Sequence, residues 1–153
     1  MKKLLVLLVL LFTCISVSAE TLEGKVTKVI DGDTIWIDAK TKVRLKWIDA
    51  PEIKQTFGKE SGKFLSDLVL GKTVSIITIS KDMYNRTLGV VMLGNTNINK
   101  MMVSEGMAWN YENYSIAEIN KLQAAARISK IGLWKPELNT TCEPWNFRKK
   151  KCQ

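Results

Sequence analysis

The sequence predicts an α+β protein, mainly a small five-stranded β-barrel with about three α-helices. Two observations support this fold class. Five short runs rich in β-branched residues are separated by turn residues, which is the pattern of consecutive strands. Apolar residues at helical spacing interrupt these runs after the third one and return after the fifth. Five strands with an inserted helix favour a closed barrel over a sandwich of two sheets.

The expected strands end at recognisable turn residues. The first, residues 22–30, runs into the tight-turn signal Asp31-Gly32-Asp33. The third stops at Asp49-Ala50-Pro51, because proline cannot donate a hydrogen bond to a neighbouring strand. In the third strand, three alternate apolar residues, the last of them Trp47, are expected on the face opposite Arg44. The five expected strands are residues 22–30, 34–38, 43–48, 72–79 and 87–93.

The expected helices also have end signals. The inserted helix, whose apolar residues lie between 64 and 69, should stop at Gly71. After the fifth strand, Asn97 or Asn99 is expected to cap a short helix. Ser115 and Glu118 form a capping box ahead of a longer helix. The remaining C-terminal residues lack periodicity, so no further helix is predicted there.

The first 19 residues are predicted to be a signal peptide, which leaves residues 20–153 as one domain. Lys2 and Lys3 precede an apolar run too short to span a bilayer, and small residues end the segment at Ala19. An uncleaved N-terminal anchor is the alternative. We therefore expect an exported monomer, secreted or periplasmic, with no stable membrane insertion after cleavage.

The chain is basic and contains no histidine. Without the two leader lysines it has 21 basic residues against 15 acidic ones, a net charge of +6. Such a charge favours polyanionic partners without identifying one. The lack of histidine excludes Ser-His-Asp and Cys-His catalysis as well as His-ligated zinc. A general base must then be a carboxylate, a lysine or a tyrosine.

Two cysteines, Cys142 and Cys152, stay in the chain after removal of the leader. An even number in an exported protein suggests a disulfide, which here would pin the C-terminus. Two free thiols are the alternative.

Four acidic residues flank the second and third expected strands, with one arginine between them: Asp31, Asp33, Arg44, Asp49 and Glu52. Folding these strands back on each other brings the two acidic clusters together, where the carboxylates raise each other's pKa. A compensating positive charge is then required, and a hard divalent cation is the usual one. The pattern predicts a metal and catalytic centre.

Each of these residues also has an ordinary structural interpretation. The two aspartates around Gly32 fit a simple turn, which spacing alone favours. Glu52 fits the first turn of a helix, where the helix dipole favours an acid. Arg44 fits a surface strand position paired with Glu23, and Arg86 fits a hairpin.

Five segments, in order along the chain, resemble the thermonuclease, or staphylococcal-nuclease-like, family. They are IDGDT (30–34), VRLKWIDAPE (43–52), DMYNRTLG (82–89), GMAWNYENY (106–114) and PWNFR (144–148). The resemblance implies an OB-fold barrel with helices. It also implies calcium-dependent cleavage of DNA and RNA, with little sequence specificity, to leave 3′-phosphate ends.

The resemblance implies a role for each matching residue around the metal. Asp33, Asp49 and the main-chain carbonyl of Ala50 look like Ca²⁺ ligands. Family members can carry threonine where this chain has Ala50, a change that a main-chain ligand tolerates. Asp31 matches an acid near the metal that is not clearly a ligand. Glu52 matches the general base that activates the attacking water.

The remaining matches concern the substrate. Arg44 and Arg86 match two arginines on the phosphate, a role that suits a planar guanidinium because it can bind two oxygens at once. Tyr84 matches a tyrosine that contacts a nucleotide phosphate. Tyr114 is a candidate for stacking on a base, whereas Trp109 is expected to pack at the helix junction.

Three functions follow as alternatives. The preferred one is an exported calcium-dependent nuclease acting on DNA and RNA, with single strands favoured. The second is a non-catalytic OB-fold module that binds single strands; such a module would be expected to have lost at least one catalytic residue, and none is lost here. The third is a basic envelope protein with no nucleic-acid role.

Overall fold

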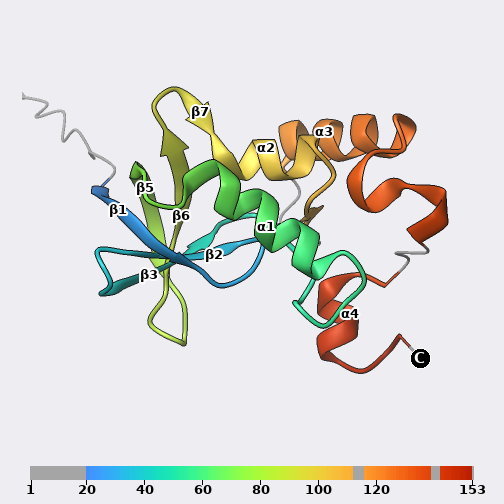
Figure 1. Ribbon diagram of the computed structural model, residues 1–153, viewed down its shortest axis with the longest axis horizontal. Coiled ribbons are helices and arrows are strands. Elements are labelled where there is room, and N and C mark those ends of the chain that lie inside the picture. Colours follow the sequence, from blue (N-terminus) through green and yellow to red (C-terminus); the bar gives the residue numbers. More distant parts are fainter. Residues whose placement is uncertain (1–19, 112–115, 139–141, 153) are drawn as a thin grey trace, which may run out of the picture.

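The computed structural model describes residues 20–111, 116–138 and 142–152, so the predicted leader (1–19) and Tyr114 lie outside the described part. Within that part, no helix combines the length and the apolar character needed to cross a membrane. Figure 1 shows a strand-rich half of the molecule, with α1 running across it and the later helices gathered at the other end.

Five strands close into the predicted barrel. Their order is β3-β2-β1-β5-β6, and a parallel pairing of β3 with β6 joins the two edges. The first three strands form the expected meander, and the two-residue β7 extends the sheet beyond β6. The barrel strands are β1 Thr21–Val29, β2 Thr34–Ile37, β3 Thr41–Leu45, β5 Thr73–Lys81 and β6 Thr87–Leu93, with β7 at Thr96–Asn97.

A second, very short sheet lies beside the barrel. It pairs β4 (Ile48–Asp49) antiparallel with β8 (Trp109–Asn110), and neither strand was predicted. In this sheet Asp49 lies opposite Trp109, whose ring meets that of Trp134 edge to face at 5.3 Å. Trp109 is therefore a packing residue, as expected.

The described residues form four α-helices, one more than predicted. They are α1 Gly58–Val69, α2 Ile98–Ser104, α3 Ala117–Ile128 and α4 Pro144–Arg148, with 3₁₀ turns at Gly132–Trp134 and Pro136–Leu138. α1 buries Leu65 and Val69 and ends just before Gly71, whose φ of 75° suits glycine. α4 lies in the segment for which no helix was expected, inside a loop closed by a Cys142–Cys152 disulfide.

The barrel interior is filled by apolar side chains from alternate strand positions. Ile35, Val43, Leu45 and Ile76 are fully buried, and Met102 of α2 closes the interior from outside the sheet. Each fully buried side chain of this size contributes about 1.5–3 kcal/mol relative to an exposed one.

The structure differs from the predictions at two turns. The third strand ends at Leu45, and Trp47 has a left-handed φ of 69°, so the expectation that Trp47 continues the apolar face of that strand is wrong. The reversal at Trp47 starts β4. The turn between β2 and β3 is centred on Asp38 and Ala39, both at positive φ, slightly earlier than expected.

The N-terminal caps expected for α2 and α3 can be compared with the structure. Asn97 caps α2, since its side chain accepts a hydrogen bond from the Lys100 amide at 3.0 Å. α3 begins after Ile116 without a side-chain cap, and Ser115 of the predicted capping box lies outside the described residues.

Asn99, the other candidate cap, is buried, and its side chain instead links separate elements by hydrogen bonds. Its carbonyl accepts from the Val91 amide at 3.0 Å, and its amide donates to the carbonyls of Lys46 (2.9 Å) and Gly89 (3.1 Å). These bonds join α2, β6 and the residue after β3 beside the pairing that closes the barrel.

Replacing Asn99 by alanine should lower the free energy of unfolding by about 3 kcal/mol, because three backbone groups each lose a hydrogen bond, two of them in buried positions. Asn97→Ala, which removes a cap two residues away, should cost about 1 kcal/mol. Urea unfolding of both variants measures the difference. An equal loss in the two proteins would contradict the role assigned to Asn99.

Candidate active site

The predicted site residues gather at one end of the barrel around a cavity of about 570 Å³. The cavity lies between the turn after β1, the end of β3, the loop after β4, the β5–β6 hairpin and α4. Its walls include seven of the nine residues predicted from the sequence: Asp31, Asp33, Arg44, Ala50, Glu52, Tyr84 and Arg86. Asp49 lies behind the wall, fully buried, and Tyr114 lies outside the described residues.

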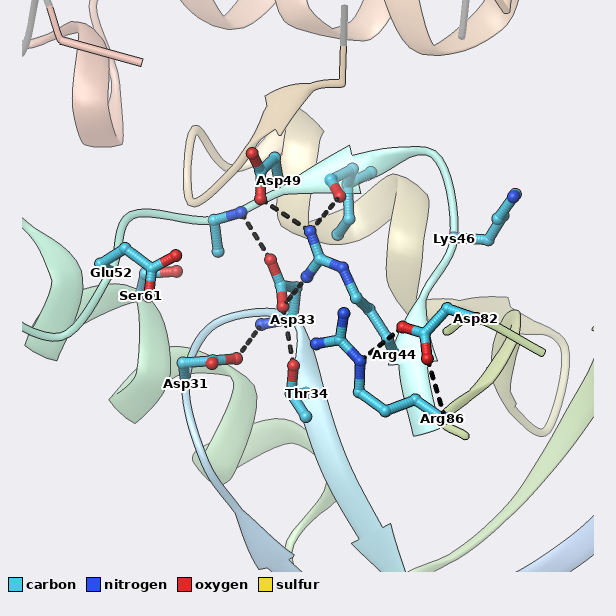
Figure 2. A network of polar contacts seen from close by, with 12 residues as sticks. Asp31, Asp33, Thr34, Arg44, Lys46, Asp49, Glu52, Ser61, Asp82 and Arg86 are labelled. Atoms are coloured by element: carbon cyan, nitrogen blue, oxygen red, sulfur yellow. Dashed lines mark hydrogen bonds and ion pairs between the residues drawn. The ribbon is translucent and has the colours of Figure 1, made fainter. Parts of the chain in front are cut away.

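Arg44 bridges two buried carboxylates. Its Nη1 pairs with Oδ1 of Asp33, and its Nη2 lies 2.7 Å from Oδ1 of Asp49 (Figure 2). The side chain of Arg44 is only 15% exposed, and those of the two aspartates are less exposed still. Buried charges of one sign are costly without a partner. Arg44 is thus a buried cation between the two carboxylates, and the alternative in which it pairs with Glu23 at the surface is wrong.

The barrel explains why these three residues meet. Thr34 lies directly opposite Arg44 in the β2–β3 pairing, so Asp33, one residue earlier, lies next to the arginine. The reversal at Trp47 then returns Asp49 on β4 to the same point. Oδ2 of Asp33 accepts the Ala50 amide at 2.8 Å, which ties the two acidic clusters together directly.

The turn before β2 packs too closely for any side chain at its centre. A Cβ at Gly32 would lie 1.9 Å from Oγ of Ser61 and 2.7 Å from Cβ of Ala50. Asp31 accepts the Asp33 amide at 3.1 Å, so the turn is also held by its own side chain. This close approach sets Asp31 and Asp33 against α1 and the loop that carries Ala50.

Burial and neighbouring charges separate the pKa values of the three aspartates. Burial raises the pKa of Asp31 to about 7, and the negative charge of Asp33 adds to the shift. Burial also acts on Asp33, but Arg44 and the Ala50 amide outweigh it and hold the pKa of that carboxyl below its usual value. Burial raises the pKa of Asp49 in spite of its arginine partners. Burial thus acts against the charged form of all three carboxyls, and only at Asp33 do the partners outweigh it.

Glu52 has a partner that the sequence reasoning missed. Arg148, the last residue of α4, donates from Nη1 to Glu52 Oε1 at 2.8 Å and from Nη2 to Asp49 Oδ2 at 2.8 Å. Glu52 precedes α1 by several residues, so the interpretation of it as a first-turn helix acid is wrong. The signal that pointed to Arg148 was its place in the PWNFR segment, to which no role had been attached.

Arg86 lies at the opposite side of the cavity from Glu52 (Figure 2). Its Nε donates to Oδ2 of Asp82 at 2.7 Å, and Oδ1 of Asp82 accepts the amides of Tyr84 and Arg86 at 2.9 Å each. Burial acts to raise the pKa of Asp82, but the hydrogen bonds and the charge of Arg86 together outweigh burial and lower this pKa. Asp82 thus holds the hairpin and Arg86 in one arrangement, and Tyr84 on that hairpin is largely exposed.

The predicted metal ligands offer oxygen donors of the type that calcium prefers. Oδ2 of Asp33 and Oδ2 of Asp49 each take part in one contact described above, and a carboxylate oxygen can accept more than one. The described residues contain no group of three or more His, Cys, Asp or Glu side chains arranged to hold a metal ion. Two aspartates and the Ala50 carbonyl would therefore need water or substrate oxygens to complete a calcium shell.

Fold and site together define a class of protein: a helix-covered OB-fold barrel with an acid–arginine cluster at one end. Residues 42–136 match the staphylococcal nuclease homologue family, a range that includes Arg44, Asp49, Glu52 and Arg86. The chain is 44% identical to an uncharacterized endonuclease of Haemophilus influenzae, over 98% of this chain and 86% of that protein.

Two further relatives cover most of the chain. It is 38% identical to an uncharacterized endonuclease of Escherichia coli, over 99% of this chain and 100% of that protein. It is also 38% identical to a micrococcal nuclease of Shigella flexneri, over 82% of this chain and 80% of that protein. The chain belongs to the staphylococcal nuclease homologue family.

Arg44→Ala should lower the free energy of unfolding by about 3–5 kcal/mol at pH 7 without calcium, because Asp33 and Asp49 are left buried without their shared cation. Since Arg44 lowers the pKa of Asp33, the ionised carboxylate stabilises the fold above its unfolded pKa of 3.8, and this contribution is lost as the pH falls. The difference between wild type and variant should therefore shrink below about pH 4.

Urea unfolding at pH 7 and pH 3.5 tests this expectation. Arg127→Ala is the matched control, since Arg127 lies on α3 with its guanidinium 4.3 Å above the Trp134 ring and outside the cavity. It should cost about 1 kcal/mol at both pH values. A loss in Arg44→Ala that does not change with pH would contradict the electrostatic explanation.

Proposed function

We propose that this protein is a calcium-dependent nuclease that hydrolyses phosphodiester bonds of DNA and RNA with little sequence specificity, leaving 3′-phosphate ends. Membership of the family and the nuclease names of its relatives support the nuclease class. The observation that carries the proposal is the single cavity that combines a partly exposed carboxylate, Glu52, with arginines on both sides of it.

The cavity suits a phosphodiester. Its cations, among them Arg44 and Arg86, favour a polyanion, and its hairpin carries the exposed Tyr84 beside Met83. Tyr84 is proposed to contact a nucleotide phosphate, and an aromatic ring beside a cationic cleft can in addition stack on an unpaired base of any sequence. This supports single strands as the favoured substrate and supports low sequence specificity, because no base edge needs to be read.

The proposed reaction assigns each residue one task. Water attacks phosphorus while Glu52 accepts its proton, and the bond from phosphorus to the 5′ oxygen breaks. The phosphate stays on the 3′ side, and the departing oxygen takes a proton from solvent. The attack adds negative charge to the phosphoryl oxygens, which guanidinium donors already in place oppose. Asp82 holds Arg86 through Nε, which leaves the Nη1 and Nη2 fork for a phosphate.

All of the proposed calcium ligands are oxygen atoms. Asp33, Asp49 and the carbonyl of Ala50 would hold the ion, with Asp31 beside them. When bound, the ion would supply positive charge to the phosphate and to the attacking water. Burial, together with the charge of Asp33, raises the pKa of Asp31, and a cation bound at this end of the cavity would favour the ionised carboxylate.

We also propose that the protein is exported and that it is a monomer. The leader predicted for residues 1–19 supports export, and so does the Cys142–Cys152 disulfide, because disulfides persist in oxidising compartments. We propose a monomer, as expected from the sequence. The protein could then be secreted or periplasmic.

Cleavage should require calcium. Purified protein is incubated with single-stranded DNA and RNA in calcium and then in excess chelator, and the products are separated by denaturing electrophoresis. We expect cleavage of both substrates in calcium, none in chelator, and recovery when calcium is restored. Undiminished cleavage in chelator would contradict the metal assignment, whereas binding without cleavage in calcium would favour the non-catalytic binding module.

Glu52→Gln should lower kcat by about a hundredfold or more while changing affinity for a short oligodeoxynucleotide by less than about twofold, because the amide cannot accept the proton of water. Affinity is measured by fluorescence anisotropy in chelator, so that no substrate is cut. Glu23→Gln, at an exposed position on β1, is the matched control and should change neither quantity. Equal losses of kcat and affinity in Glu52→Gln would indicate a structural role instead.

A further inference from the structure

The charged side chains of the site form one alternating series: Asp33, Arg44, Asp49, Arg148 and Glu52. Arg44 joins the first two carboxylates, and Arg148 joins Asp49 to Glu52 through two different nitrogens at 2.8 Å each. A second contact, 3.1 Å from Nη1 of Arg148 to Asp49 Oδ1, makes the pairing with Asp49 two-pronged. Arg148 is therefore the link between the base and the predicted metal ligands.

Glu52 depends on such a link because no helix or strand holds it. It lies in the loop between β4 and α1, and its side chain is about one-third exposed, at 36%. A carboxylate in such a position would otherwise sample several rotamers. Arg148 selects one of them and sets it at a defined separation from Asp49, which the planar fork of a guanidinium can do and a lysine cannot.

The segment that supplies Arg148 is itself fastened to the Glu52 loop. Gln55 accepts the Glu52 amide through Oε1 at 2.8 Å and donates through Nε2 to the carbonyl of Cys142 at 3.1 Å. The disulfide from Cys142 to Cys152 then closes the loop that contains α4. The C-terminal segment thus contacts the base region twice, at its main chain through Gln55 and at its carboxylate through Arg148.

An aromatic contact fixes the same segment to the barrel side of the cavity. The rings of Trp145 on α4 and Tyr111 after β8 lie 5.7 Å apart, and Pro144 at the start of α4 is buried. Tyr111 also lines the cavity together with Arg148. The C-terminal segment is therefore a wall of the site, docked by packing and by hydrogen bonds and closed on itself by the disulfide.

We propose that Arg148 is a positioning residue of the nuclease, which the disulfide-closed C-terminal segment delivers to hold Glu52 at a fixed place relative to Asp49. This inference rests on the proposed function, in which Glu52 is the general base. Lysines 149–151 also carry positive charge in this segment, so the contribution specific to Arg148 is the geometry of its bidentate contacts.

The test compares three single variants with wild type in calcium. Arg148→Ala should lower kcat by about tenfold with KM within about twofold of wild type, because the base is misplaced while substrate binding is retained. Arg148→Lys should recover only part of kcat. Lys149→Ala, which removes the same charge from the same segment, should leave kcat unchanged.

A second arm asks whether the disulfide acts through Arg148. The double variant Cys142→Ser/Cys152→Ser should lower kcat by about threefold, since the docked arrangement is less populated without the closure. The triple variant Cys142→Ser/Cys152→Ser/Arg148→Ala should then have the same kcat as Arg148→Ala alone, because both changes disrupt the same arrangement. If the losses of kcat from the two changes multiply in the triple variant, the disulfide-closed segment does not act by placing Arg148, and the inference is wrong.

A third measurement does not depend on activity. In calcium-free protein, amide hydrogen exchange of residues 144–151 should be at least about fivefold faster in Arg148→Ala than in Lys149→Ala, while exchange in the barrel strands stays unchanged. Unchanged exchange in Arg148→Ala, or a kcat equal to that of Lys149→Ala, would overturn the inference. If wild type cuts nothing in calcium, the proposed function fails, and the exchange rates alone decide whether Arg148 docks the tail.

Discussion

The contact on which the rest of the site depends is the buried pairing of Arg44 with Asp33 and Asp49. Two carboxylates at this depth repel each other and lose their hydration, so the barrel can close over them only with a cation between them. The parallel pairing of β3 with β6 then holds Arg44 against the hairpin side of the barrel. The same arrangement fixes the charge of Asp33, which adds to the effect of burial in raising the pKa of Asp31.

Much of this could be predicted from local patterns. The barrel strands, the inserted helix and the meander follow from residue alternation and from turns such as Asp31-Gly32-Asp33, which report on a few neighbouring residues each. The proximity of Asp33 and Asp49 could also be predicted, because a meander with short turns allows few arrangements of its strand ends. The resemblance to the family added roles that spacing alone did not distinguish from those of ordinary turn acids.

Other features could not be predicted, for physical reasons. The reversal at Trp47 places a bulky residue at positive φ, a conformation that its type disfavours and that only the tertiary structure enforces. Arg148 sits in a five-residue helix without apolar periodicity, and its partner Asp49 is 99 residues away in the sequence. Asp82 could have been predicted as a partner of Arg86, since it precedes the arginine by four residues, but the family pattern assigned roles to Tyr84 and Arg86 only.

The edge-to-edge pairing of β3 with β6 has a consequence for how the chain folds. Helices and hairpins form from contacts between near neighbours, whereas Val43 meets Thr87 only after β5 and β6 have assembled, and Arg148 must arrive from the far end of the chain. Until these distant contacts form, the carboxylates of the cluster are expected to lack part of their set of arginine partners. We therefore expect the site to assemble late in folding, after the local helices and hairpins have formed.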